Sequence, residues 1–147
     1  MKHQASTLSS IIQSASHLPL PLAAELYATH GVPVFPCGQD KAPITTHGFH
    51  DASTDVETIR KWWQEHPDAL VGMPTGDGVV VVDIDVKKGD GFKSAAALNL
   101  SNTFTVGTRS GGAHWYYEGD GRCTTDLVPY VDIRASGGYV IVPPSAG

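Results

Sequence analysis

The stretch Val79-Val80-Val81-Val82-Asp83-Ile84-Asp85 decides the fold of this chain. Its four consecutive valines are β-branched and stiff at χ1, so they favour an extended backbone over a helix. An apolar run without polar alternation is typical of a strand covered on both faces, which predicts a position in the middle of a sheet. Because side chains alternate along a strand, we expect Asp83 and Asp85 to point to the same face.

Two carboxylates on one face of a strand need a positive partner. At an effective dielectric of about 20, two like charges about 5 Å apart repel by roughly 3 kcal/mol. Oxygen ligands suit Mg²⁺ or Mn²⁺, so the pair Asp83 and Asp85 predicts a divalent metal site. The alternative for so short a pattern is a strand end that has reached solvent, with two hydrated aspartates.

Length and composition set the bounds for the rest of the chain. With 147 residues, of which 41% are hydrophobic and 17% charged, it is predicted to be one globular domain with a substantial core. The formal net charge of −5 argues against a purely electrostatic nucleic-acid binder, although it is compatible with a local basic groove.

The cysteines and apolar runs indicate the compartment. Cys37 and Cys123 are expected to be free thiols in a reducing environment. A zinc site built from Cys37, His47 and His50 lacks an evident fourth ligand, so we expect no structural zinc. No apolar run reaches the length of a membrane span, and the N-terminal residues do not resemble a signal peptide. We therefore expect a cytoplasmic protein with no membrane partner.

The first half of the chain predicts helices and short strands. Residues 1–20 are Ser-rich and are expected to form a peripheral arm with one short amphipathic helix. A second helix is expected from Pro21 to just before Gly31, because proline suits the first turn and glycine the position after the last. Short strands are predicted at 32–36, at a sheet edge because of the prolines, and at 70–74.

A further helix is predicted between these two strands, after a loop at 38–53. Thr54 and Glu57 have the spacing of a capping box, and the helix should end before Pro67. The apolar face of this helix is expected to consist of Val56, Ile59 and either Trp62 or Trp63, and the two tryptophans are expected in the core. Later in the chain, residues 89–94 lack the glycine that a phosphate-binding P-loop needs before its lysine, so a short helix over 95–98 is expected instead.

The last third predicts two hairpins of similar design. Strands at 103–108 and 113–117 flank one turn, and strands at 131–134 and 139–142 flank the other. Both turns carry Gly-Gly after serine, which a need for positive φ would explain by itself. The fold class predicted is therefore α+β (α/β), with helices early and antiparallel strands late around the valine strand.

Polar residues of the two hairpins extend the acidic pair into a constellation. Asp132 is embedded in a predicted strand and is well placed to be a third metal ligand beside Asp83 and Asp85. Three acids of this kind can hold paired metals about 4 Å apart, as nucleotidyl transfer requires. Arg109 and Ser110 precede the first Gly-Gly, whose backbone can approach a phosphate closely, while arginine offers a planar charged partner. His114 follows directly and can donate to a triphosphate oxygen.

The order and spacing of these motifs resemble a known family. The motifs are Val81-Val82-Asp83-Ile84-Asp85, Thr108-Arg109-Ser110-Gly111-Gly112-Ala113-His114, Val131-Asp132-Ile133-Arg134, and the run from Gly137 to Ser145. They resemble the three signature motifs of the archaeo-eukaryotic primase superfamily. More narrowly, they resemble the bifunctional primase–polymerase (prim-pol) domain at the N-terminus of plasmid and phage replication proteins. Residues 31–36, 41–43, 51–54 and 71–76 are also similar to that domain, so the resemblance covers roughly residues 20–147.

The resemblance implies an archaeo-eukaryotic primase-like fold. In that fold an N-terminal α/β unit and an RRM-like antiparallel sheet enclose the active site, with residues 21–147 as the catalytic domain. It further implies roles for individual residues. The metal ligands would be Asp83, Asp85 and Asp132, which with His114 form the catalytic set, and the nucleotide would be held by Arg109, Ser110, Gly111, Gly112 and His114, with Lys41 as a further phosphate contact.

The implied function is template-directed nucleotidyl transfer, with DNA primase and DNA polymerase activity, in phage or plasmid replication. It would use Mg²⁺ or Mn²⁺ in a two-metal site, with single-stranded DNA template, primer and dNTP or NTP as substrates. Relatives usually continue beyond this point, so we expect a fragment of a longer multidomain replicase that carries a C-terminal helicase or accessory domain.

Two other functions are compatible with parts of the pattern. The chain could be a catalytically inactive RRM-like module that binds nucleic acid in a replication initiator, but the three strand-embedded acids argue for catalysis. A replication-initiator nuclease needs a pair of histidines separated by one apolar residue, and no His-x-His occurs in the sequence.

Overall fold

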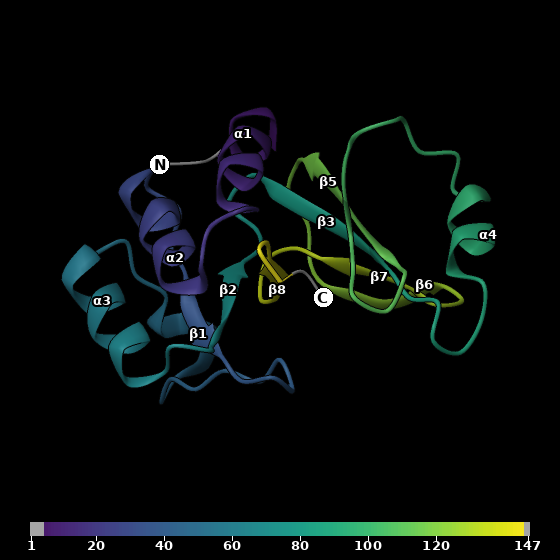
Figure 1. Ribbon diagram of the computed structural model, residues 1–147. Helices are drawn as coiled ribbons and strands as arrows, with labels where there is room; N and C mark the ends of the chain where they lie inside the picture. Colours follow the sequence, from purple (N-terminus) through teal and green to yellow (C-terminus); the bar gives the residue numbers. More distant parts are fainter. Residues whose placement is uncertain (1–4, 146–147) are drawn as a thin grey trace.

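The computed structural model describes residues 5–145, which form two units packed against each other (Figure 1). The first unit contains α1 (Ala5–Ala15), α2 (Leu20–Thr29), α3 (Val56–Glu65), the 3-10 helix η1 (Gly48–Asp51) and the strands β1 (Phe35–Cys37), β2 (Leu70–Pro74) and β8 (Tyr139–Val142). The second contains β3 (Val79–Ile84), α4 (Gly91–Ala96), β4 (Phe104–Gly107), β5 (Ala113–Glu118), β6 (Thr124–Val128) and β7 (Val131–Arg134).

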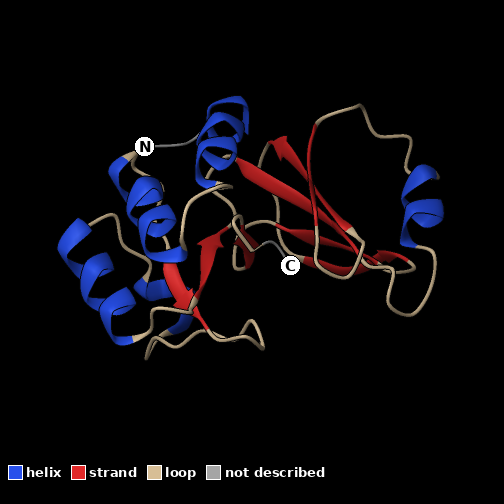
Figure 2. Ribbon diagram, in the orientation of Figure 1, coloured by secondary structure: helices blue, strands red, loops and turns tan. Residues whose placement is uncertain are grey.

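Each unit has its own antiparallel sheet, as Figure 2 shows. The three-stranded sheet has the order β1-β2-β8, and the five-stranded sheet has the order β4-β5-β3-β7-β6. The predicted α+β class, the central place of the valine strand and the edge position of the first strand are all confirmed. Among residues 5–145, no helix is both long enough and apolar enough to cross a membrane.

The two faces of β3 are buried in different ways. On one face, Val82 and Ile84 pack with Ala95 of α4 in a small core of their own. On the other face, Val79 and Val81 join the main core that the helices of the first unit cover. Asp83 is the next residue on this second face, so the polar end of the strand begins where the main core ends.

Helix α1 is part of the main core, so the prediction of a peripheral arm at residues 1–20 is wrong for the described residues. The amphipathic helix itself is confirmed, since Leu8, Ile11, Ile12 and Ala15 are all buried. They pack in the same cluster as Val79 and Val81. The physical reason is that the apolar half of the five-stranded sheet needs a cover, and α1 lies over it (Figure 1).

The other helices agree with the sequence in place but not in every detail. α2 has Pro21 in its first turn, and Gly31 just beyond its end has φ 79°, as predicted. α3 ends before Pro67 and buries Ile59 and Trp63. The capping box, however, is wrong, because the N-cap is Asp55 and its side chain makes no bond to the helix backbone.

The glutamate that a capping box would use has other partners. Glu57 pairs with Arg60 at 3.1 Å, and Arg60 also reaches Glu25 on α2 at 2.6 Å. Glu57 therefore takes part in an ion pair within α3, and Arg60 extends this pair to α2. The remaining short helix, α4, is confirmed in kind but lies a few residues earlier than expected, at Gly91–Ala96.

The first predicted hairpin is confirmed, and the second is wrong. β4 and β5 pair directly, with Gly111 at φ 93° in the turn. β7 and β8, in contrast, belong to different sheets, because β7 pairs with β3 and β6 whereas β8 pairs with β2. The connection between them still needs positive φ at Gly137, which has φ 90°.

The reason lies in a second chain crossing at the same place. The turn from β2 to β3 also passes from one sheet to the other, and it lies against the connection between β7 and β8. The Thr75 hydroxyl donates to the carbonyl of Ala135 at 2.7 Å, and the Thr75 amide donates to Gly138 at 3.0 Å. A methyl group on Gly76 would lie 2.9 Å from Cα of Ser136. The chain therefore passes between the two sheets at two neighbouring connections, from β2 to β3 and from β7 to β8.

Candidate active site

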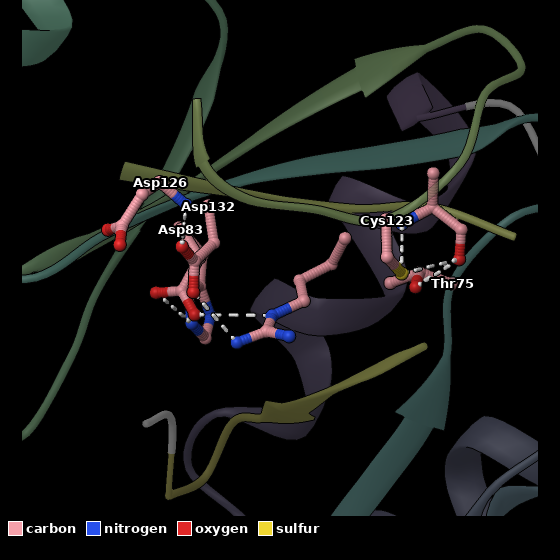
Figure 3. A network of polar contacts seen from close by, with 8 residues as sticks. Thr75, Asp83, Cys123, Asp126 and Asp132 are labelled. Atoms are coloured by element: carbon pink, nitrogen blue, oxygen red, sulfur yellow. Dashed lines mark hydrogen bonds and ion pairs between the residues drawn. The ribbon is translucent and has the colours of Figure 1, made fainter. Parts of the chain in front are cut away.

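One row of polar side chains crosses the middle of the five-stranded sheet. In the register of the strands, His114 of β5 lies opposite Asp83 of β3, and Asp83 lies opposite Asp132 of β7. Residues directly opposite each other in an antiparallel pair project to the same face. Three residues from distant parts of the sequence therefore meet on one face, and Figure 3 shows Asp83 and Asp132 side by side.

This row forms part of the wall of a cavity of about 640 Å³ between the two units. The second unit lines it with Asp83, Ile84, Asp85, Lys87, Lys88, Thr108, Ser110, His114, Cys123, Thr125, Asp126, Tyr130, Asp132 and Arg134. The opposite wall consists of Lys41 and Phe49 from the 38–53 loop, Gly137 and Gly138, and Tyr139, Val140 and Ile141 of β8. The candidate site thus lies between the helical unit and the five-stranded sheet.

Asp83 is held as a carboxylate by the cations around it. Nε2 of His114 lies 3.4 Å from Oδ1 of Asp83, and Nε of Arg134 lies 3.6 Å from Oδ2. Burial alone would raise the pKa of Asp83. The hydrogen bond and charge of His114, followed by the charges of Arg134 and Lys41, outweigh burial and hold the pKa below its ordinary value.

Asp132 is equally well engaged. Its Oδ1 accepts the backbone N–H of Asp126 at 2.8 Å, and its Oδ2 accepts from Nη2 of Arg134 at 3.1 Å. Asp126 has φ 51° within an irregular stretch of β6, and that conformation turns its N–H toward Asp132 (Figure 3). Arg134 therefore bridges the two acids.

Asp85 lies beyond the end of β3 and is held separately. Its backbone N–H donates to the carbonyl of Tyr130 at 2.9 Å, and its Oδ1 accepts the N–H of Lys87 at 2.8 Å. In the part of the chain that the structure describes, no three His, Cys, Asp or Glu side chains gather closely enough to hold a metal ion. The carboxylate donors suit Mg²⁺ or Mn²⁺ in their chemistry, and in this structure the cation between two of them is Arg134.

A comparison with protein families places these features in one of them. Residues 24–147 match the family described as bifunctional DNA primase/polymerase, N-terminal (Prim-Pol). The chain belongs to the Prim-Pol family. No curated protein matches the chain. Membership confirms the resemblance seen in the motifs and implies a nucleotidyltransferase-type enzyme that acts on nucleic acid and nucleotides. The matched residues begin within α2, so α1 lies outside them although it completes the main core.

His114 is the most buried polar residue of the Prim-Pol site, with 4% of its surface exposed. Its Nδ1 has no hydrogen-bond partner among the described residues, and neither does the hydroxyl of Tyr116 on the same face of β5. Leaving a buried polar atom unpaired costs about 1–3 kcal/mol. Burial, together with the nearby charge of Asp83, raises the pKa of Tyr116, so this phenol stays neutral. A buried ring nitrogen without a partner needs an explanation, and a functional role of His114 is one that its place in the cavity wall supports.

Lys41 faces the acids from the opposite wall, as the sequence predicts for a phosphate contact. Its backbone has φ 70°, an uncommon conformation for lysine. Burial lowers its pKa first, and the charges of Lys87 and Arg109 lower it further, whereas Asp83 and Asp85 act in the opposite direction. Lys41 of the first unit therefore lines the same cavity as the acids Asp83 and Asp85 of the second unit.

The glycine turn of the first hairpin contributes less to the cavity than the sequence suggests. Ser110 lines the cavity, whereas Arg109, Gly111 and Gly112 do not. A methyl group on Gly112 would lie only 2.1 Å from the carbonyl oxygen of Ile84. The structure therefore gives Gly112 a packing role, which lets the start of β5 approach the end of β3.

Arg134 is part of the motif that contains Asp132, but the sequence indicated no role for it. The alternation that places Asp83 and Asp85 on one face also places Arg134 on the same face as Asp132, two residues along β7. This signal was available in the sequence. It could not be used without the partner strand, because only the pairing of β7 with β3 brings Arg134 to Asp83.

Proposed function

We propose that this Prim-Pol domain catalyses template-directed nucleotidyl transfer, making and extending primers with dNTP or NTP in phage or plasmid replication. The observation that carries the proposal is the row His114, Asp83 and Asp132 on the wall of a cavity whose opposite wall carries Lys41. Such a cavity can accept the triphosphate of a nucleotide beside a set of acids.

Asp83 and Asp132, with Asp85 close by in sequence, would hold Mg²⁺ or Mn²⁺. When bound, such ions supply charge neutralisation at the phosphates and favour ionisation of the attacking hydroxyl. The fit rests on the chemistry of the donors and on their evident preference for a cation, which Arg134 satisfies here. Oδ1 of Asp85 accepts the Lys87 amide, which leaves Oδ2 of Asp85 as the oxygen that would join the other two acids.

The residues of the chain itself would orient the nucleotide. Lys41 is placed to contact the triphosphate from the opposite wall, and Ser110 offers a hydroxyl from the hairpin. Nε2 of His114 lies on Asp83, so this nitrogen can donate to a phosphate oxygen only when it leaves or shares that contact, whereas Nδ1 has no partner among the described residues. Positioning and charge stabilisation of this kind account for most of the catalysis in phosphoryl transfer.

The cavity also offers contacts for a nucleic-acid strand. Although the formal net charge is −5, four of the ten basic residues, Lys41, Lys87, Lys88 and Arg134, line this one cavity. Tyr130 lines it as well and remains 38% exposed, so its ring is available for stacking on a base. These four cations share the cavity with four acids, Asp83, Asp85, Asp126 and Asp132, so the cavity is not a net basic groove. A single strand would be held there by individual cations and by stacking on the aromatic ring.

The alternative is an inactive module that binds nucleic acid. It is favoured by one observation, namely that Arg134 already forms ion pairs with two of the acids while Asp85 is held separately by the Lys87 amide. An extension assay on a primed template, with labelled dNTP or NTP and with Mn²⁺ or Mg²⁺, separates the two functions. Metal-dependent extension supports the enzyme, whereas binding to the template without extension supports the module.

Variants make the assay specific to the site. We expect Asp83→Asn and Asp132→Asn each to lower extension below about a tenth of wild type, which corresponds to a barrier increase of at least about 1.4 kcal/mol. Asp77→Asn is the matched control, because Asp77 is an exposed turn residue with φ 51° and asparagine tolerates that conformation. Extension by Asp83→Asn at the level of Asp77→Asn would remove Asp83 from the catalytic set.

A further inference from the structure

Arg134 makes two contacts that together define its position. Its Nε lies 3.6 Å from Oδ2 of Asp83, and its Nη2 lies 3.1 Å from Oδ2 of Asp132. The side chains of Arg134, Asp83 and Asp132 are 34%, 28% and 25% exposed, so all three are partly shielded from water. The guanidinium is therefore bound at the wall of the cavity and does not extend freely into solvent.

The two carboxylates beside Arg134 would repel each other if no cation lay between them. Asp83 and Asp132 are direct partners across neighbouring strands, and like charges in that arrangement destabilise a sheet. A planar guanidinium can serve two carboxylate acceptors at once, which the point charge of a lysine does less well. In this structure Arg134 supplies the positive charge between Asp83 and Asp132, whereas the sequence predicts a positive partner between Asp83 and Asp85.

We propose that Arg134 is the resident counter-ion of the acidic pair and gives way when a divalent cation binds. The inference rests on the proposed function, because it concerns the metal that the Prim-Pol site would take. It assigns Arg134 a positioning role: Arg134 keeps Asp83 and Asp132 together in the metal-free protein, and it lowers the affinity of the site for metal.

The occupancy of the carboxylate oxygens explains why the two cations compete. Oδ1 of Asp83 faces His114, and Oδ1 of Asp132 accepts the amide of Asp126. The two Oδ2 atoms face Arg134, so Asp83 and Asp132 would hold a divalent cation with carboxylate oxygens that Arg134 now occupies. A guanidinium and a divalent cation at the same oxygens would repel each other strongly in this partly shielded place. Metal binding is therefore an exchange of cations.

Titration calorimetry with Mn²⁺ tests this exchange. The experiment compares wild type with Arg134→Ala, Arg134→Lys and Lys88→Ala. Lys88→Ala is the matched control, because it removes a positive charge from the same cavity and Lys88 is exposed. We expect Arg134→Ala to bind Mn²⁺ at least about tenfold more tightly than wild type, or about 1.4 kcal/mol. Lys88→Ala should change the affinity less than about threefold.

Thermal melting of the same proteins without metal provides the second readout. Arg134→Ala should melt at a lower temperature than Lys88→Ala, because it leaves the two acids uncompensated. Arg134→Lys keeps the charge but cannot serve both acids equally, so its Mn²⁺ affinity should lie between those of wild type and Arg134→Ala. If Arg134→Ala does not fold, the Mn²⁺ affinity of Arg134→Lys decides the question, because the inference requires it to exceed the affinity of wild type.

The outcomes separate this inference from the proposed function. If wild type binds Mn²⁺ but Arg134→Ala and Arg134→Lys bind it no more tightly than Lys88→Ala, the inference is overturned and the proposed function stands. If Mn²⁺ binds only to the Arg134 variants, the inference is supported and the metal-dependent function of the wild-type domain fails. If no protein binds Mn²⁺, both fail.

Discussion

Replacing Gly112 by alanine should disturb the end of the central strand more than any other glycine substitution in the first hairpin. The new methyl group would meet the carbonyl oxygen of Ile84 at 2.1 Å, where real side chains essentially never come closer than 3.0 Å. Because Ile84 pairs with Ala113 on one side and Val131 on the other, its carbonyl cannot move away alone. The chain must therefore separate β5 from β3 beside Asp83.

The size of the effect follows from the kind of contact. Overpacking costs about 1–3 kcal/mol in general, and a clash with paired backbone belongs at the upper end, so we expect a loss of about 3 kcal/mol. For a domain of this size, that loss lowers the melting temperature by roughly 6–12 °C. Extension activity should fall as well, even below the melting temperature, because the separated strands carry Asp83 and His114.

Two glycines of the same hairpin provide controls for thermal melting. A methyl group on Gly107 would meet no atom within 4 Å, so Gly107→Ala should change the free energy of unfolding by less than about 1 kcal/mol. Gly111 has φ 93° and only Val86 nearby at 3.7 Å, so Gly111→Ala should cost about 1–2 kcal/mol through backbone strain. If Gly112→Ala melts within about 2 °C of Gly107→Ala, or above Gly111→Ala, the packing argument is refuted.

Three further predictions concern the core, the pH dependence and the nucleotide. Leu8→Ala should lower the free energy of unfolding by about 2–5 kcal/mol in urea denaturation, because Leu8 is 1% exposed. Leu22→Ala, on the exposed side of α2, should lower it by less than about 0.5 kcal/mol. Equal effects of the two substitutions would show that α1 does not contribute to the core. Because folding lowers the pKa of Asp83, its ionised carboxylate stabilises the protein fully above its ordinary pKa of 3.8, and this contribution is lost as the pH falls through the lower pKa of the folded state. The stability advantage of wild type over Asp83→Asn should therefore shrink below about pH 4, and a pH-independent difference between the two proteins would contradict the assignment. His114→Ala should weaken nucleotide binding and the chemical step with little change in DNA affinity measured by fluorescence anisotropy, and an equal loss of DNA affinity would make His114 a contact to the strand instead.

The site illustrates how far motif reasoning reaches. The sequence was sufficient to select Asp83, Asp132, His114 and Lys41, and the structure brings all four to one cavity. Their spacing could not show which carboxylate oxygens are already occupied. Arg134 and the backbone of Asp126 take those positions. Arg134 reaches Asp83 only through the pairing of β7 with β3, and the Asp126 amide reaches Asp132 only through the irregular pairing of β6 with β7.

The elements that the sequence determined by itself are those whose cause is local. The valine run, the turn at Gly111 and the ends of α2 depend on side-chain shape, positive φ and terminal proline or glycine, all of which act within a few residues. Only the tertiary structure decided that α1 joins the core, that β7 and β8 part into two sheets and that Arg134 bridges two acids. Each of these depends on which distant surface buries an apolar face or compensates a charge, and no local pattern in the chain encodes that choice of partner.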